Sequence, residues 1–216
     1  MPKKSEVETK TSYDKMSKWY DALAGRFERK YREQGLQKLD AKIGEKILEI
    51  GLGTGNCVVA LAHSVGTSGR VYGIDLSAGM LRIALSRIKA EGITEKVTLL
   101  RGDAVYLPFK AACFDAILLI FTLELFDNQA IPGVLHECQR ILRHRGRICV
   151  AALSKKKMVN VITRLYEWSH KKFPQYIDCR PIFIQQSLAD TGFDVLDITE
   201  MSAWGLPIDI VLAKKP

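Results

Sequence analysis

The sequence lacks any apolar run long enough to cross a bilayer. Its longest nearly apolar run, from Ala116 to Phe126, contains Glu124 and is much shorter than the roughly 20 residues that a membrane-spanning helix needs. The first ten residues are polar and charged, with no apolar stretch behind them that would resemble a secretory signal. We therefore expect the run to be a buried strand and the protein to be cytoplasmic.

Cysteine is too scattered for a disulfide framework or a structural zinc site. The five cysteines include no Cys-x-x-Cys pair and have no histidine at ligand spacing. We therefore expect no metal site. The formal net charge of +8 is compatible with phosphate-bearing partners, but it more simply favours solubility. No specific nucleic-acid partner is expected, and no motif indicates an oligomeric state.

The chain has 216 residues, of which 47% are hydrophobic, so it is long enough to bury one substantial core. From Lys46 onward, short β-rich runs alternate with helical patterns, which is typical of βαβ units and a mostly parallel sheet. The clearest helix is predicted over Ala78–Glu91, with Ser77 as N-cap and Gly92 just past its end. The expected strands are Lys46–Ile50, Arg70–Ile74, Lys96–Leu100, Phe114–Ile120 and Arg147–Ala152.

The flanks of this core have different patterns. Tyr13–Leu39 reads as one or two helices broken near Gly25, and Lys155–Phe173 is basic and amphipathic. Towards the end of the chain, Phe193–Thr199 and Pro207–Ala213 are expected to pair as an antiparallel hairpin at the sheet edge.

The most informative segment is Glu49-Ile50-Gly51-Leu52-Gly53-Thr54-Gly55-Asn56, placed where the first strand ends and a helix begins. Glycines at this point let the backbone turn tightly and let a ligand lie against the main chain. The dinucleotide fingerprint requires a third glycine at position 56, where this sequence has Asn56. The spacing Gly-x-Gly-x-Gly therefore disfavours a pyrophosphate ligand.

Two acidic residues follow the next two strands. Asp75 ends the second strand, where a carboxylate can accept hydrogen bonds from both hydroxyls of a ribose, although an aspartate there can also cap a helix. Asp103, within Gly102-Asp103-Ala104, follows the third strand, where it can accept from an adenine amino group. The order and spacing of these motifs predict a nucleoside site.

With these motifs in place, the run from Ile47 to Val150 resembles the class I S-adenosylmethionine (SAM) dependent methyltransferases, especially the ubiquinone and menaquinone C-methyltransferases. Leu107-Pro108-Phe109, Phe114-Asp115 and the turn Leu142-Arg143-His144-Arg145-Gly146-Arg147 also resemble segments of that family. The resemblance implies SAM as cofactor. Its implied binding residues are Glu49, Gly51, Gly53, Gly55 and Asn56 around the methionine end, Asp75, Leu76 and Met80 at the ribose and adenine, and Gly102, Asp103 and Ala104 after the third strand.

The resemblance further implies a Rossmann-like, doubly wound α/β fold with seven strands, an antiparallel last strand and helices on both faces. Tyr13-Asp14 and Trp19-Tyr20-Asp21 resemble the aromatic N-terminal lid of this branch, so Tyr13 is expected to cover the cofactor. The chain then divides into an N-terminal helical lid (1–40), a SAM-binding core (41–153), a lid or acceptor insertion (154–181) and a C-terminal helix with a hairpin (182–216).

The segment after the fourth strand is expected to line the mouth of the donor site, because ligands of open α/β sheets sit at strand carboxyl ends. Ile120 and Phe121 would contact the cofactor there. Glu124 is the only ionisable group of this segment and is the candidate general base; the alternative is a carboxylate that faces solvent or binds a backbone amide. Many relatives have histidine where Leu125 stands. His63, His136, His144 and His170 are expected away from this mouth.

The resemblance favours an apolar or lipid-linked acceptor, such as a quinone precursor or a phospholipid-like molecule, reached beneath the amphipathic stretch Lys155–Phe173. Its apolar face and its lysines would allow peripheral contact with an anionic membrane, or the apolar face simply packs on the sheet. A soluble small-molecule acceptor is the main alternative. A non-catalytic SAM- or lipid-binding module stays open, whereas the spacing at Asn56 argues against an NAD-dependent dehydrogenase.

Overall fold

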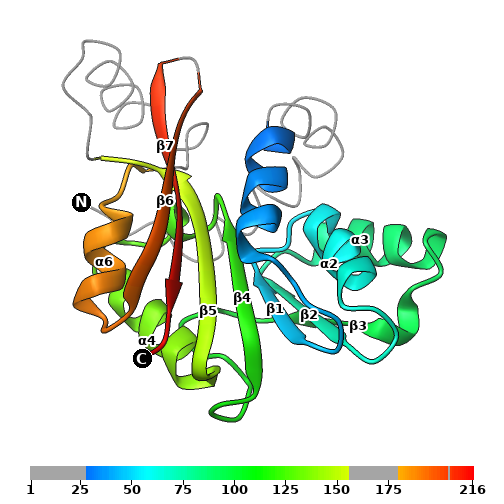
Figure 1. The fold of residues 1–216 in the computed structure, drawn as a ribbon. Helices are drawn as coiled ribbons and strands as arrows, with labels where there is room; N and C mark the ends of the chain where they lie inside the picture. Colours follow the sequence, from blue (N-terminus) through cyan, green and yellow to red (C-terminus); the bar gives the residue numbers. More distant parts are fainter. Residues whose placement is uncertain (1–27, 156–179, 204) are drawn as a thin grey trace.

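A computed structural model describes residues 28–155, 180–203 and 205–216, which form a seven-stranded sheet with helices on both faces (Figure 1). A helix over residues 28–39 precedes the first strand. The strands are β1 Lys46–Ile50, β2 Arg70–Asp75, β3 Val97–Arg101, β4 Phe114–Ile120, β5 Leu142–Leu153, β6 Asp194–Ala203 and β7 Leu206–Lys214. The helices are α2 Asn56–Ser64, α3 Ala78–Ala90, α4 Ile131–Ile141 and α6 Ile184–Asp190, with 3-10 turns η1 Thr94–Lys96 and η2 Leu123–Leu125.

The strand order is β3-β2-β1-β4-β5-β7-β6. The first five strands in this order pair in parallel, and β7 pairs antiparallel with both β5 and β6. This arrangement confirms the Rossmann-like sheet, its antiparallel last strand and the terminal hairpin. The chain leaves β1 towards β2 and returns beside β1 as β4, so the direction of winding reverses between them. Ligands of such sheets bind at the carboxyl ends of the strands beside this reversal.

The fifth strand begins earlier than the sequence indicated. Arg147 was expected to open it after a turn, but β5 starts at Leu142, which pairs with Phe114. The register then shifts between Phe114 and Ala116, and Arg145 has a positive φ of 61°. The expected turn, Leu142 to Arg147, is therefore part of the strand. Its first residue already pairs with β4, and the residues after it form an irregularity before regular pairing begins at Arg147.

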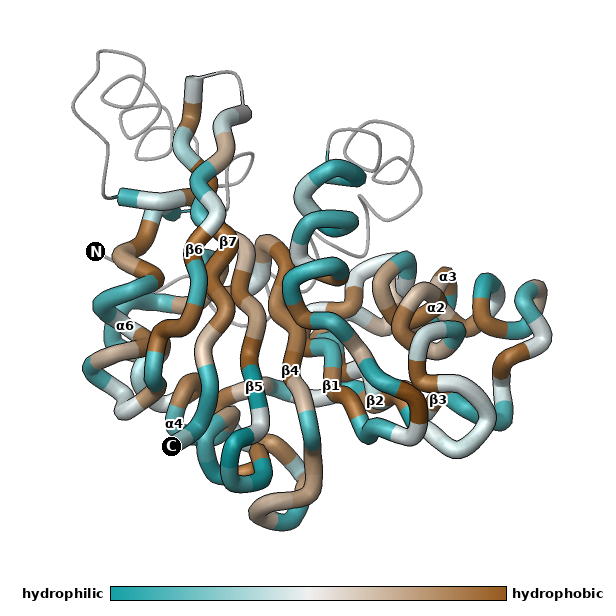
Figure 2. The backbone as a smooth tube through the Cα atoms, viewed as in Figure 1, coloured by the Kyte–Doolittle hydropathy of each residue, from teal (hydrophilic) through white to brown (hydrophobic). Residues whose placement is uncertain are grey.

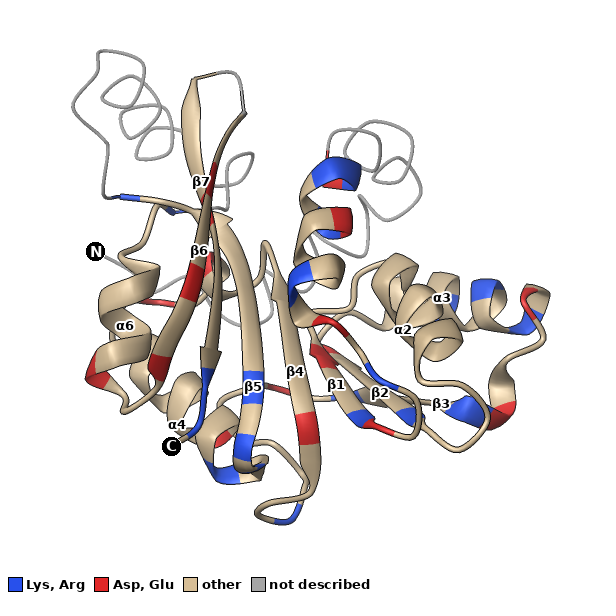
Figure 3. Cartoon of the chain, viewed as in Figure 1, with Lys and Arg blue, Asp and Glu red and all other residues tan. Residues whose placement is uncertain are grey.

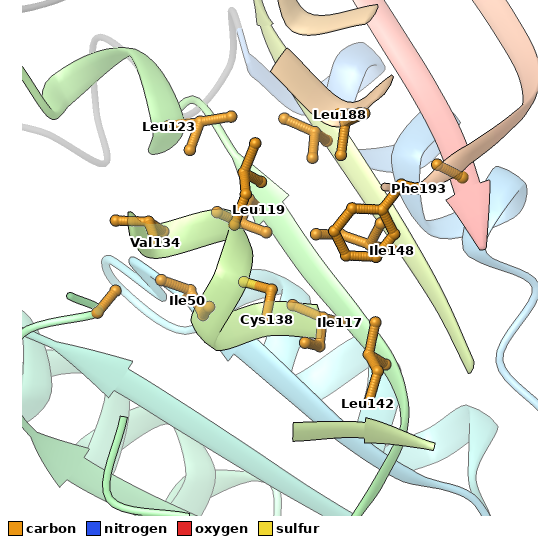
Figure 4. Close-up of a cluster of buried hydrophobic side chains, with 14 of the residues drawn as sticks. Ile50, Ile117, Leu119, Leu123, Val134, Cys138, Leu142, Ile148, Leu188 and Phe193 are labelled. Carbon is orange, nitrogen blue, oxygen red and sulfur yellow. The ribbon is translucent and has the colours of Figure 1, made fainter. Parts of the chain in front are cut away.

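Each face of the sheet carries its own hydrophobic cluster. Ile117 and Leu119 of β4 pack with Val134 and Cys138 of α4 (Figure 4). Leu118, the residue between them, points to the opposite face, where α2, α3 and the helix 28–39 contribute side chains. Because both faces are covered, the central strands are apolar nearly throughout (Figure 2).

Within the described ranges, no helix is both long enough and apolar enough to cross a bilayer. Tyr13 and most of the expected N-terminal lid lie outside the described residues, as does the stretch 156–179 that contains nearly all of the expected amphipathic helix.

Candidate functional site

The glycine-rich turn between β1 and α2 adopts a backbone that side chains disfavour. Gly51, Gly53 and Gly55 have φ values of 69°, 52° and 81°, in the left-handed region where glycine has no steric penalty. A Cβ on Gly51 would lie 2.4 Å from the Thr122 side chain, and one on Gly55 would lie 2.9 Å from Cβ of Ala84. A Cβ on Gly53 would meet none of the described residues within 4 Å. Two glycines therefore allow close packing of the protein, and the third leaves open space above the turn.

Asp75 ties this turn to the end of β2. Its Oδ2 accepts a hydrogen bond from the Gly53 amide at 2.9 Å, and its Oδ1 accepts from the Ser77 amide at 2.8 Å. A carboxylate has about four acceptor positions, so these two amide hydrogen bonds do not conflict with the expected ribose contact. The capping role belongs to Ser77, whose Oγ accepts from the Met80 amide at 3.2 Å and starts α3 as expected.

Glu49 has a carboxylate oxygen with no hydrogen-bond partner among the described residues. Its side chain is 3% exposed, and its Oε2 is buried with no hydrogen bond within the described part of the chain. Burial raises the pKa of Glu49 to about 8, a hydrogen bond from the Cys57 thiol opposes this, and the charge of Asp75 adds to it. A cationic or hydrogen-bond-donating ligand group would satisfy this oxygen, and the ammonium of SAM is such a group.

The first turn of α2 is a second feature that fits the methionine end of SAM. In the described part of the chain the N-cap Gly55 has no side-chain capping hydrogen bond, and the first turn of α2 contains no acidic residue. The Val58 amide of this turn already donates to the Glu49 carboxyl. The amides before it lie at the positive end of the helix dipole, where a ligand carboxylate is favoured. Asn56 takes part differently from the expectation: its Nδ2 donates to Thr54 Oγ1 at 3.1 Å and its Oδ1 accepts from Arg87. This side chain therefore joins α2 to α3.

The residues expected at the adenine lie at the ends of β2 and β3. Leu76 is 43% exposed, so it offers an uncovered apolar surface, whereas Met80 and Ala104 are buried. Asp103 accepts from the Val105 amide through Oδ1 at 3.0 Å. The preceding residue, Gly102, donates its amide to the Asp75 carbonyl at 3.1 Å. The two nucleoside-binding candidates Asp75 and Asp103 are thus held beside each other by the backbone.

The far side of the mouth is aromatic. Phe121, directly after β4, has a positive φ of 50° and donates its amide to the Ala151 carbonyl at 2.8 Å. Its ring packs edge-on against Tyr31 at a centroid distance of 5.6 Å, and the Tyr31 hydroxyl donates to the Ser202 carbonyl at 2.8 Å. A bulky residue in the left-handed region costs about 1–3 kcal/mol and is retained only where its surroundings determine it. Ile120 lies beneath the helix 28–39, where Gly35 permits the close approach.

Glu124 is fully buried in η2, so it does not face solvent. Its Oε1 accepts from the Leu153 amide at 3.4 Å, and its Oε2 has no partner within the described ranges. Burial raises the pKa of Glu124 to about 8; hydrogen bonds from backbone amides lower it, and Glu28 raises it. The raised pKa means that burial favours the protonated form of this carboxyl.

The helix 28–39 contributes charged residues to this region that were not among the expected site residues. Charged side chains of both signs lie on this helix (Figure 3). Glu28 and Arg32 form an ion pair of 3.8 Å and are mostly buried; Glu28 raises the pKa of Glu124, and Arg32 opposes the rise in the pKa of Glu49. The spacing of four residues between Glu28 and Arg32 is the signal that places them on one helical face.

Residues 47–146 match the family of methyltransferase domains. A demethylmenaquinone methyltransferase of Lactobacillus johnsonii is 32% identical over 147 residues, which cover 68% of this chain and 59% of that protein. One of Bacillus cytotoxicus is 31% identical over 163 residues, covering 74% of this chain and 68% of that protein. Methyltransferase GfsG of Streptomyces halstedii is 29% identical over 187 residues, covering 84% and 64%. This chain thus spans less than two thirds of the length of the first of these relatives.

Among solved structures, the cyclase SpnF aligns with a TM-score of 0.79 and 17% identity, over 96% of this chain and 95% of that chain. This likeness concerns the fold. The matches in sequence cover β1 through α4 and the carboxyl-end turns that carry the candidate donor site. The chain belongs to the class I SAM-dependent methyltransferases.

Proposed function

We propose that this chain transfers the methyl group of SAM to an apolar or lipid-linked acceptor and that Glu124 receives the proton that the acceptor loses. The observation that carries the proposal is the buried Glu124 carboxyl just after β4, whose Oε2 has no hydrogen-bond partner among the described residues. Relatives above 30% identity named as demethylmenaquinone methyltransferases favour the apolar acceptor class.

The chain's own residues account for binding and orientation of the donor. The uncovered backbone at Gly53, the carboxylate of Asp75 and the uncapped turn of α2 would hold the methionine and ribose parts. When bound, SAM supplies an electrophilic methyl group on a sulfonium. Alignment of two reactants is worth roughly 7–11 kcal/mol in favourable intramolecular systems, so the protein needs no nucleophile of its own.

A proton acceptor is needed when the methylated atom carries a hydrogen. An aromatic carbon or a hydroxyl oxygen gains the methyl group and then releases a proton. Glu124 can accept that proton only in its ionised form, so with a pKa of about 8 the methyl transfer should become faster as pH rises towards 8. The partly exposed Phe121, three residues before Glu124, provides an apolar ring, and the buried Tyr31 ring packs edge-on against it. Together these groups favour a flat, weakly acidic acceptor.

A soluble small-molecule acceptor is the second candidate, and the ion pair of Glu28 and Arg32 favours it. This pair provides charged groups near the buried Glu124, which suit a polar acceptor better than a hydrocarbon tail. The same donor site serves either acceptor, so the decision depends on where the methyl group appears.

The test incubates a cell extract with the protein and methyl-labelled SAM, and then separates organic and aqueous fractions before mass spectrometry. We expect label in the organic fraction. Glu124→Gln should lower kcat at least tenfold while affinity for S-adenosylhomocysteine stays unchanged, because the amide cannot accept the proton. Glu95→Gln, at an exposed position, is the matched control.

Each other outcome rejects a defined part of the proposal. Label in the aqueous fraction alone would indicate the soluble acceptor. Tight S-adenosylhomocysteine binding with no label in either fraction would indicate a non-catalytic binding module. Full activity of Glu124→Gln across the pH range would remove Glu124 as the proton acceptor. Sedimentation with neutral and anionic vesicles would separately test peripheral membrane contact.

A further inference from the structure

The loop after β3 carries Asp103 and then runs along α4. At its start the Gly102 amide donates to the Asp75 carbonyl at 3.1 Å, and at its end the Ala112 amide donates to the Arg140 carbonyl at 3.0 Å. Between these anchors the loop bonds to itself, as in the Tyr106 amide to the Asp103 carbonyl at 3.2 Å. Such local bonds shape a loop but do not place it relative to the sheet.

Two charged side chains of α4 supply that placement. The Glu137 Oε2 accepts from the Leu107 amide at 2.9 Å. The Arg140 guanidinium donates to the Leu107 carbonyl at 3.0 Å and to the Phe109 carbonyl at 2.7 Å. Glu137 and Arg140 also bond each other, with Nε to Oε1 at 2.6 Å and Nη2 to Oε2 at 2.8 Å. Both the donor and the acceptor of Leu107 are therefore engaged by one ion pair.

Apolar packing holds the same loop against the sheet and α4. Ala104 and Leu107 are buried in the cluster shared with α4, and the Phe109 ring packs edge-on against Tyr72 and Phe114. Apolar contacts are non-directional, whereas charge-assisted hydrogen bonds from a planar guanidinium impose a defined backbone geometry. The ion pair thus fixes the backbone register of the segment immediately after Asp103.

We infer that Glu137 and Arg140 are positioning residues for the adenine end of the donor site. They act through residues 103–109 and do not touch the cofactor themselves. This inference rests on the proposed function, because it takes Asp103 as the acceptor for the adenine amino group. The Arg140 hydrogen bond lowers the pKa of Glu137, so the pair stays charged at neutral pH.

The experiment measures discrimination between two nucleosides. Calorimetry compares S-adenosylhomocysteine with S-inosylhomocysteine, in which an oxo group replaces the 6-amino group of the base. We expect wild type to prefer the adenine ligand by at least about tenfold, since the oxo group leaves Asp103 without a donor. Arg140→Gln should weaken adenine binding about tenfold, equivalent to about 1.4 kcal/mol, and bring the ratio close to one. Arg140→Lys should fall between, because it keeps the charge but not the fork of donors.

Discrimination is the decisive readout, because general loosening of the fold would weaken both ligands alike and leave their ratio intact. Arg143→Gln removes a different arginine ion pair, with Asp115, and should leave the ratio unchanged. Circular dichroism checks that each variant is folded. If Arg140→Gln does not fold, Glu137→Gln supplies the same test, because it removes the carboxylate that accepts from the Leu107 amide.

An unchanged ratio in folded Arg140→Gln, or in folded Glu137→Gln, would overturn the inference while leaving the donor site intact. A wild-type protein that binds both ligands equally would overturn the assignment of Asp103 and, with it, this inference. Failure of wild type to bind either ligand would instead reject the donor site and the proposed methyl transfer together.

Discussion

Gly53→Val and Gly92→Val would each place a valine in the left-handed region of the Ramachandran plot. Gly53 has a φ of 52° and Gly92 one of 67°, and in the described ranges a Cβ at either position meets no atom within 4 Å. A side chain in the left-handed region costs roughly 1–2 kcal/mol. Urea unfolding should therefore show a similar loss of stability in both variants. Gly92→Val is thus a matched control for backbone strain.

The two variants should differ in donor binding. Gly53 lies in the glycine-rich turn after β1, and its amide donates to the Asp75 carboxylate. Gly92 lies past the end of α3. We expect Gly92→Val to bind S-adenosylhomocysteine within twofold of wild type. Gly53→Val should bind at least 100-fold more weakly, equivalent to about 2.8 kcal/mol, because the branched side chain fills the ligand's space. Calorimetry that finds equal affinities in the two folded variants would refute the placement of the donor.

Three further predictions concern charged groups. Asp75→Ala should weaken S-adenosylhomocysteine binding by about 1.5–3 kcal/mol in calorimetry, because ribose hydroxyls lose a charged acceptor. Arg147→Met should lower the free energy of unfolding by about 2–4 kcal/mol, because Glu45 and the carbonyls of Leu39 and Asp40 lose the guanidinium. The free energy of unfolding should fall as pH rises from about 4.5 to about 8 and then level off. The reason is that the pKa of Glu124 is raised to about 8 in the folded protein, so over this range the folded protein holds a proton that the unfolded chain has released. Glu124→Gln should reduce this slope in urea titrations.

Each of these predictions has its own control. Unchanged affinity in folded Asp75→Ala would remove the ribose assignment. Arg29→Met breaks an exposed ion pair with Glu33, so it should cost much less stability than Arg147→Met. Equal losses in the two variants would contradict the stabilising role of the partly buried Arg147 hydrogen bonds. Glu49, whose pKa is also raised to about 8, titrates over the same range, so part of the slope should persist in Glu124→Gln. An unaltered slope would show that Glu124 is ionised in the folded protein.

Local signals in the sequence were enough for much of the sheet. The runs Lys46–Ile50 and Phe114–Ile120 were predicted with the bounds that the structure has, and Ser77 and Gly92 bound α3 as expected. These signals act between near neighbours, through apolar runs, capping hydrogen bonds and glycine backbone geometry. The predicted start of β5 at Arg147 was wrong. Leu142 joins the strand by pairing with Phe114 of β4, and a local sequence pattern does not show such a pairing.

The donor turn was also readable from the sequence, because glycine spacing constrains the backbone directly. The positive φ angles of Gly51, Gly53 and Gly55 and the hydrogen bond from Gly53 to Asp75 agree with that interpretation. The sequence did not show that Gly51 and Gly55 serve packing while Gly53 faces open space. That distinction depends on Thr122 and Ala84, which come from distant segments.

Tertiary structure alone decided the state of the charged groups. Asn56 turns towards Arg87, Glu124 is buried against Leu153, and Arg140 holds the loop after β3. Each of these contacts joins residues about 30 positions apart, so no local pattern specifies it. The sequence determined where the chain turns and which groups end the strands, because those properties follow from backbone sterics. Which carboxylates lose their water, and which partners they then find, followed only from how the helices cover the sheet.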